Sequence, residues 1–175
     1  TGTMYVSRNN LYLTTPNTSF WITPLATPKE ETLIYRVRLD QENIVVEADG
    51  SVQGYVLNQF SMDEYNGLFR IATTKGWGDA SVNNLYVLNM SLGVVGKLEG
   101  LAQGERIYSA RFMGDRGYLV TFRQIDPFFV VDLSNPLEPK VLGYLKIPGF
   151  SGYLHPYDEN NIIGVGRQDN NLKLS

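Results

Sequence analysis

Cysteine is absent from the sequence, and histidine occurs only once, as His155. Disulfides, thiolate metal sites, thiol catalysis and a metal centre of several histidines are therefore excluded. Basic residues do not dominate either: 15 Lys and Arg stand against 18 Asp and Glu, a formal net charge of −3. This balance argues against a nucleic-acid or anionic-membrane surface. The apolar runs are only a few residues long, so neither a membrane span nor a signal peptide is expected.

A stretch that could form a long helix is also missing. Such a helix needs apolar residues at three- and four-residue spacing over roughly 10–12 residues without Pro or Gly. The sequence instead contains 11 Tyr, 8 Phe, 17 Gly and 8 Pro, a composition typical of short strands joined by turns. The apolar runs at 33–39, 85–88 and 128–131 alternate with polar residues or are β-branched and aromatic throughout. The 175 residues, 43% of them hydrophobic, predict about one all-β domain with a packed core.

A strand–turn–strand pattern recurs along the chain. Residues 108–120 align without a gap with residues 153–165, and earlier copies lie at 56–71 and 4–13. Each copy is followed by two further strands. The expected third strands are 33–39, 85–89, 128–133 and 171–174, and the expected fourth strands are 44–47, 94–98 and 141–145. Tyr35, Tyr86 and Phe129 occupy corresponding positions in three of the third strands.

Four strands in a unit of roughly 40–50 residues are typical of a β-propeller blade. The expected blades are residues 4–54, 55–104, 105–149 and an incomplete unit at 150–175, with linkers at Asp49-Gly50, Gly100–Gly104 and Pro148–Gly149. A β-sandwich is the alternative, although a sandwich has no reason to repeat at the residue level. We therefore expect an all-β protein, a propeller of four-stranded antiparallel blades, here about three and a half blades.

One segment carries a resemblance to a known family. Residues 128–136, FFVVDLSNP, followed by 139–143, PKVLG, resemble the LVIVD repeat of bacterial and archaeal surface propellers. Residues 55–167 are similar to the C-terminal β-propeller domain of secreted or cell-surface prokaryotic proteins, distantly related to WD-type repeats. The resemblance implies a propeller fold and an extracytoplasmic setting, and it carries over no catalytic residue. The first unit departs most from the pattern, through an insert at 16–31.

The loops between second and third strands should share one rim of a propeller with the linkers between blades. These loops, at 16–31, 75–82, 123–127 and 167–171, contain Trp21, Trp77, Arg123 and Arg167. Packing of the insert explains Trp21, whereas Trp77 lies between two glycines with little to bury it. We expect Trp77, Arg123 and Arg167 to form a site for a protein, peptide or glycan ligand.

The alternative is that each of these arginines pairs only with a nearby aspartate, Asp126 or Asp169. His155 is added to the ligand-site candidates because it falls in an expected inner strand. There it would line the channel or be hydrogen-bonded within a blade interface.

A non-catalytic binding or scaffold module at the cell surface is the preferred function. The alternatives are a hydrolase-type enzyme at the channel mouth, with His155, Arg111 and Tyr157 as candidates, or the non-catalytic propeller of a larger hydrolase. No G-x-S-x-G elbow or pair of catalytic carboxylates is present, so no catalytic residue is assigned. The Asp- and Asn-rich turns lack the spacing of a calcium loop, so no cofactor and no metal ion are expected.

Closed propellers have about four to eight blades. The sequence lacks an initiator Met and stops at Ser175 within an expected third strand. We therefore expect a fragment of a larger propeller, whose partners are the remaining blades of the parent protein. Uncovered blade faces would drive self-association, with two copies able to close a ring.

Overall fold

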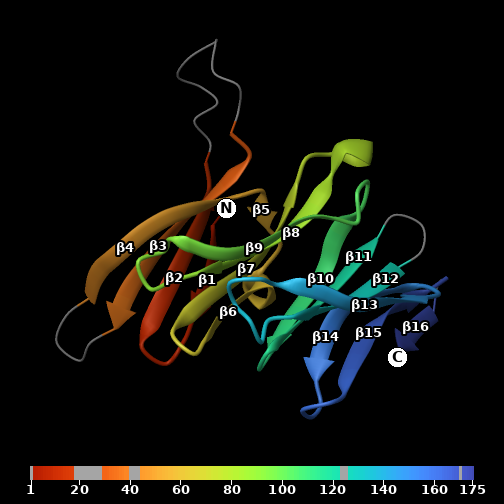
Figure 1. The fold of residues 1–175 in the computed structure, drawn as a ribbon. Coiled ribbons are helices and arrows are strands. Elements are labelled where there is room, and N and C mark those ends of the chain that lie inside the picture. Colours follow the sequence, from red (N-terminus) through yellow and green to blue (C-terminus); the bar gives the residue numbers. More distant parts are fainter. Residues whose placement is uncertain (1, 18–28, 40–43, 123–125, 170) are drawn as a thin grey trace.

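The computed structural model describes residues 2–17, 29–39, 44–122, 126–169 and 171–175. Four antiparallel sheets follow one another in chain order, with the first and last sheets at opposite ends of the molecule (Figure 1). The first sheet, blade 1, contains β1 (Thr3–Val6), β2 (Asn10–Pro16), β3 (Glu31–Leu39) and β4 (Ile44–Gln53). Each strand pairs with its neighbour in the chain.

Blade 2 contains β5 (Tyr55–Val56), β6 (Met62–Tyr65), β7 (Leu68–Lys75), β8 (Val82–Leu88) and β9 (Val94–Leu101). Blade 3 contains β10 (Arg106–Met113), β11 (Arg116–Phe122), β12 (Asp126–Asp132) and β13 (Lys140–Ile147). Blade 4 contains β14 (Phe150–Pro156), β15 (Ile162–Gln168) and β16 (Asn171–Leu174). The expected all-β architecture of antiparallel propeller blades is therefore confirmed.

Apolar side chains pack between neighbouring blades rather than within one sheet. Because strand side chains alternate, β8 sends Tyr86 and Leu88 toward blade 1 and Leu85 and Val87 toward blade 3. Three buried clusters result. The blade 1–2 cluster includes Tyr12, Ile34 and Phe69; the blade 2–3 cluster includes Phe112, Phe129 and Val131; the blade 3–4 cluster includes Tyr118, Val120 and Leu154.

The corresponding aromatic positions of the third strands are buried in blades 2 and 3 but not in blade 1. Tyr86 is 3% exposed and Phe129 is 9% exposed, so the prediction that both are core residues is confirmed. Tyr35 is 38% exposed, because no described blade packs on the side of blade 1 that faces away from blade 2.

The linker expected at Asp49-Gly50 is wrong, because both residues lie inside β4. This strand pairs with β3 along its whole length, as far as the contact between Gln53 and Glu31. A Cβ atom at Gly50 would lie 2.7 Å from the carbonyl oxygen of Leu92 in the next blade. The glycine therefore permits close packing between blades rather than a chain reversal.

A polar network also joins the first two blades. One Glu64 carboxylate oxygen accepts hydrogen bonds from Ser7 Oγ at 2.8 Å, Asn10 Nδ2 at 2.9 Å and the Tyr12 hydroxyl at 2.7 Å. Burial, followed by the hydrogen bond to Glu64, raises the pKa of Tyr12 well above its usual range. The network satisfies a partly buried carboxylate and fixes the position of β2 against β6.

A turn follows the end of β12 at Asp132. Asp132 Oδ1 accepts a hydrogen bond from the Ser134 backbone N–H at 2.9 Å, and Asn135 Oδ1 accepts one from the Leu137 N–H at 3.2 Å. The hydrogen bonds from Ser134 lower the pKa of Asp132. Asp132 therefore stabilises a turn through its side chain.

Candidate functional site

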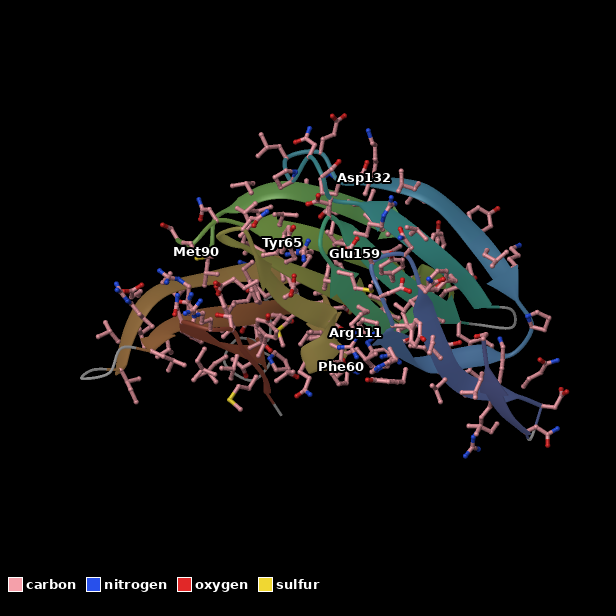
Figure 2. The ribbon with its side chains drawn as sticks, turned by 90° about the horizontal axis from the view of Figure 1, so that it is seen from below. Phe60, Tyr65, Met90, Arg111, Asp132 and Glu159 are labelled. Carbon is pink, nitrogen blue, oxygen red and sulfur yellow. The ribbon has the colours of Figure 1, made fainter. Side chains whose placement is uncertain are left out.

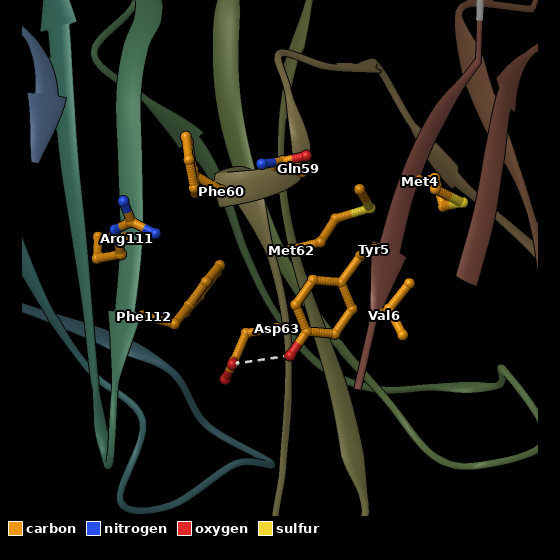
Figure 3. Close-up of a pocket in the computed structure, with 9 residues that line it drawn as sticks. All are labelled: Met4, Tyr5, Val6, Gln59, Phe60, Met62, Asp63, Arg111 and Phe112. Carbon is orange, nitrogen blue, oxygen red and sulfur yellow. Dashed lines mark hydrogen bonds between the residues drawn. The ribbon is translucent and has the colours of Figure 1, made fainter. Parts of the chain in front are cut away.

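The first strands of blades 1, 2 and 3 surround a pocket of about 370 Å³, here called the inner-strand pocket (Figure 3). Its volume falls in the range of small-molecule sites, roughly 300–1,000 Å³. The lining residues are Met4, Tyr5 and Val6 from β1, Gln59, Phe60, Met62 and Asp63 from blade 2, and Arg111 and Phe112 from β10.

An interruption of the first strand in blade 2 shapes this pocket. The short 3-10 helix η2 (Gln59–Ser61) separates β5 from β6, and both of these strands pair with β7. Asn58 caps η2 by accepting a hydrogen bond from the Phe60 backbone N–H at 2.9 Å. The repeat alignment predicted a regular strand–turn–strand unit over residues 56–71 and therefore no helix. Asn58 is nevertheless a residue type that favours such caps.

Arg111 lines the inner-strand pocket, and its guanidinium stacks on the ring of Phe60. Its guanidinium carbon lies 4.0 Å from the Phe60 ring centroid and 5.3 Å from that of Tyr153, and its Nε donates to the Leu154 carbonyl oxygen at 2.9 Å. Figure 2 shows Phe60 and Arg111 side by side, with Asp132 on the far side of the molecule. The aromatic ring and the carbonyl hold the guanidinium in a fixed orientation.

No carboxylate of the described residues forms a salt bridge with Arg111. Burial lowers the pKa of Arg111, while Tyr153 acts in the opposite direction. An arginine remains charged in a protein, so the side chain carries a partly desolvated positive charge into the pocket. Such a charge is a reason to look for an anionic ligand.

Asp63 also lines the inner-strand pocket, but its carboxylate is already engaged. One oxygen pairs with the buried Arg70 guanidinium. The other oxygen accepts a hydrogen bond from the Tyr5 hydroxyl at 3.4 Å, the dashed line in Figure 3. Burial raises the pKa of Tyr5, so its hydroxyl stays neutral at physiological pH. Because Arg70 balances Asp63, Arg111 gives the inner-strand pocket a net positive charge.

His155 is exposed on β14, beside the pocket rather than inside it. Its Nδ1 lies 3.2 Å from the Tyr153 hydroxyl, and Tyr153 in turn packs edge-on against Phe60 with ring centroids 5.6 Å apart. Tyr157 is 70% exposed and lines a different hollow, together with Asp115 and Arg116. The structure therefore connects His155 to Arg111 through Tyr153, whereas Tyr157 lies apart.

Of the rim residues, Trp77 is 65% exposed at the start of the 3-10 helix η3 (Gly78–Ala80). Arg167 is exposed on β15 and pairs in register with Leu172, and no salt bridge joins it to Asp169 in the described part of the chain. Trp21 and Arg123 lie outside the described residues. The convergence of Trp77, Arg123 and Arg167 therefore stays a prediction.

Arg106 packs against Trp77 and was not among the residues expected at the rim. The Arg106 guanidinium carbon lies 4.6 Å from the Trp77 ring centroid. Arg106 begins β10, directly after the linker between blades 2 and 3, which shares a rim with the loop that contains Trp77. That topological rule could have suggested this pair, but it does not specify which side chains meet.

Within the described ranges, no three or more His, Asp and Glu side chains come close enough together to hold a metal ion. Likewise, no helix in the described part of the chain has the length and apolar content needed to cross a membrane.

Successive meandering sheets, with inner strands around a common pocket and apolar clusters between the sheets, define a β-propeller. A family model described as "Beta propeller domain" matches residues 1–175, and the chain belongs to this family. It is 54% identical over 151 residues to an uncharacterised protein of Archaeoglobus fulgidus, a match that covers 85% of this chain and 24% of the relative. It is 52% identical over 150 residues to an uncharacterised protein of Methanocaldococcus jannaschii, covering 83% and 24%. The chain thus spans about a quarter of the length of these relatives.

Proposed function

We propose that this propeller is a non-catalytic binding module of a longer protein and that its inner-strand pocket binds a small organic anion through Arg111. The observation that supports this proposal is a half-buried guanidinium without a carboxylate partner among the described residues, in a pocket of about 370 Å³. A carboxylate suits it because the planar guanidinium can donate two parallel hydrogen bonds to its oxygens.

The rest of the pocket favours an apolar body on the anion. Met62, Phe60 and Phe112 supply apolar surface beside Arg111. Stacking on Phe60 and the hydrogen bond to Leu154 restrict the guanidinium before any ligand arrives, which reduces the entropy lost on binding. We therefore expect an aromatic or aliphatic monocarboxylate to bind more tightly than sulfate.

The lining residues favour binding over hydrolysis. They include no Ser, Thr, Lys or His, so no side chain of these nucleophile types faces the ligand. The Tyr5 hydroxyl stays protonated because burial raises its pKa, so it is not available as a base, and the Asp63 carboxylate is paired with Arg70.

Substitution of Arg111 tests the proposed anion site. Isothermal titration with benzoate, phenylacetate and hexanoate should detect binding to the unchanged protein, and Arg111→Gln should weaken it by about 10- to 100-fold, because a charged hydrogen bond contributes about 1.5–3 kcal/mol. Arg38→Gln is the matched control, since Arg38 is an exposed arginine paired with Glu47. Absence of binding by all three acids, or equal affinity in Arg111→Gln, would contradict the proposal.

The scaffold part of the proposal concerns two uncovered sheet faces. The open face of blade 1 consists of Met4, Val6, Leu13, Tyr35, Leu39, Ile44 and Val46, which the strand register places on the side away from blade 2. The open face of blade 4 includes Val165, Leu172 and Leu174. Ile44 is 79% exposed and Leu172 is 76% exposed. We propose that further blades of the longer protein cover both faces.

In isolation, these faces should make the chain self-associate. Light scattering across a wide concentration range should show a rising average mass, and the double substitution Ile44→Lys with Val46→Lys should suppress the rise. Both side chains are exposed, so the change in the free energy of unfolding should stay below about 1 kcal/mol. Leu137→Lys, at a 66% exposed position in a turn, should leave association unchanged. A monomer at every concentration would overturn this part of the proposal.

We also propose that the longer protein works outside the cytoplasm, on the basis of the family resemblance of residues 128–143 alone. Mild protease treatment of intact source cells should then cleave the protein while sparing a cytoplasmic enzyme. Cleavage that occurs only after cell lysis would contradict an external location.

A further inference from the structure

Trp77 is a large aromatic side chain that remains 65% exposed on the rim of the molecule, next to η3, the yellow-green coil at the top of Figure 1. Arg106 packs on its ring, and Arg106 also lines a shallow hollow of about 260 Å³ with Leu57, Ile107 and Tyr108. We call Trp77 and Arg106, with this hollow, the rim platform. Leu57 is 46% exposed and Tyr108 is 40% exposed, so apolar surface also lies beside Arg106.

The backbone holds Trp77 in this exposed position. Gly76 has a φ of 80°, and a Cβ atom there would lie 2.6 Å from the Ala80 carbonyl oxygen. The Gly76 N–H donates to the Glu30 carboxylate at 2.5 Å, and the Ala80 N–H donates to the Trp77 carbonyl oxygen at 3.2 Å. The loop is therefore a defined turn, so the exposure of the indole is a property of the fold.

The far end of the loop is fixed as well. The Ser81 hydroxyl bridges the loop to the next linker, with Oγ 2.7 Å from the Gly78 carbonyl oxygen and 3.0 Å from that of Glu105. Glu105 directly precedes Arg106, so this bridge keeps the arginine beside the indole. Stacking against Arg106 then restricts rotation of the ring.

The geometry leaves one broad face of the indole open. Arg106 occupies the other face, with its guanidinium carbon 4.6 Å from the ring centroid, and it has no salt bridge within the described residues. A peptide side chain binds strongly where a pocket encloses and desolvates it, which an open flat ring does not do. A flat aromatic face matches a sugar ring, which presents C–H groups on one side and hydroxyls around its edge.

We propose that the rim platform is a carbohydrate-binding site, in which a pyranose ring stacks on the open face of Trp77. Arg106 fixes the indole from behind. This site is independent of the inner-strand pocket, because no residue is common to the two sets of lining residues.

Tryptophan fluorescence provides the direct readout. The chain has two tryptophans, so Trp21→Phe leaves Trp77 as the single indole. Titration with cellotetraose, chitotetraose, mannotetraose and xylotetraose should give, for at least one of them, a saturable blue shift and protection from iodide quenching. An exposed indole that becomes covered by a ligand produces both changes.

Variants then connect binding to the rim platform. Trp77→Ala should lower the affinity for that oligosaccharide at least tenfold in calorimetry, and Arg106→Gln should lower it by a smaller factor. Tyr157→Ala is the matched control, because Tyr157 is 70% exposed and lies outside the rim platform. Trp77→Ala should keep its thermal midpoint because the side chain is exposed.

The proposal is overturned if none of the four oligosaccharides changes the emission of Trp77, a readout that does not depend on the folding of the Trp77 and Arg106 variants. It is also overturned if Trp77→Ala binds as tightly as the unchanged protein. Selection of a peptide from a displayed library that binds through Trp77, with no oligosaccharide binding, would assign the surface to a protein partner instead.

Discussion

Replacing Tyr86 by Ala should lower the free energy of unfolding by about 3–5 kcal/mol, the loss usual for large aromatic side chains in packed cores. Tyr86 is 3% exposed and packs in the cluster between blades 1 and 2. Its hydroxyl donates to Glu99 at 2.9 Å, so the substitution also removes a hydrogen bond. Phe129→Ala, at the corresponding position of blade 3, should cost a similar amount. Denaturant unfolding measures both changes.

Tyr35→Ala is the matched control, because it makes the same change at the corresponding position of blade 1. Tyr35 is 38% exposed on an open face, so the loss should stay near 1 kcal/mol. Lys75→Ala, at the end of β7, and Lys173→Ala, in the last strand β16, should cost under about 0.5 kcal/mol each. Equal and small effects at all of these sites would mean that the repeat alignment is wrong.

Arg70→Met should also destabilise the protein strongly, by about 3–5 kcal/mol. Arg70 is 3% exposed, pairs with Asp63, donates to the Gly114 carbonyl oxygen at 2.6 Å, and lies over the Phe112 ring at 5.1 Å. Its removal leaves the Asp63 carboxylate without its cation at the junction of blades 2 and 3. Thermal and denaturant unfolding should both show the loss.

Two further variants separate the ion pair from simple packing. Asp63→Leu combined with Arg70→Met should recover part of the stability, because it removes both charges together. Arg38→Met should cost only about 0–1 kcal/mol, since the Arg38–Glu47 pair is exposed to solvent. If Arg70→Met is as mild as Arg38→Met, Arg70 does not stabilise the blade junction.

The repeat could be predicted from the sequence because a blade imposes the same demands in each copy. Alternation along a strand sends neighbouring residues toward opposite blades, so the aromatic positions Tyr86 and Phe129 recur with recognisable spacing. The exposure of Tyr35 at the equivalent position does not follow from the repeat pattern, since it depends on whether another blade covers the face. The linker predicted at Asp49-Gly50 is wrong because glycine favours turns but also permits close packing, which is its role in β4.

The candidate sites depend on contacts between distant segments, and a sequence pattern does not record such contacts. Arg111 meets Phe60 only because η2 interrupts a strand, and Arg106 meets Trp77 only because two loops share a rim. Topology predicts the shared rim, but not which side chains touch. Reasoning from the sequence therefore named Trp77 as a ligand-site candidate and Arg111 as a candidate of the alternative enzyme, but it missed Phe60 and Arg106 beside them.

The central claim is that this chain forms blades of a larger propeller, and Tyr35 tests it most directly. The measurement is the loss of stability caused by Tyr35→Ala in the longer protein, compared with the loss in the 175-residue chain. If a further blade covers the open face of blade 1, the loss in the longer protein should rise to that of Tyr86→Ala, about 3–5 kcal/mol. An unchanged loss near 1 kcal/mol would show that Tyr35 stays exposed and would contradict the claim.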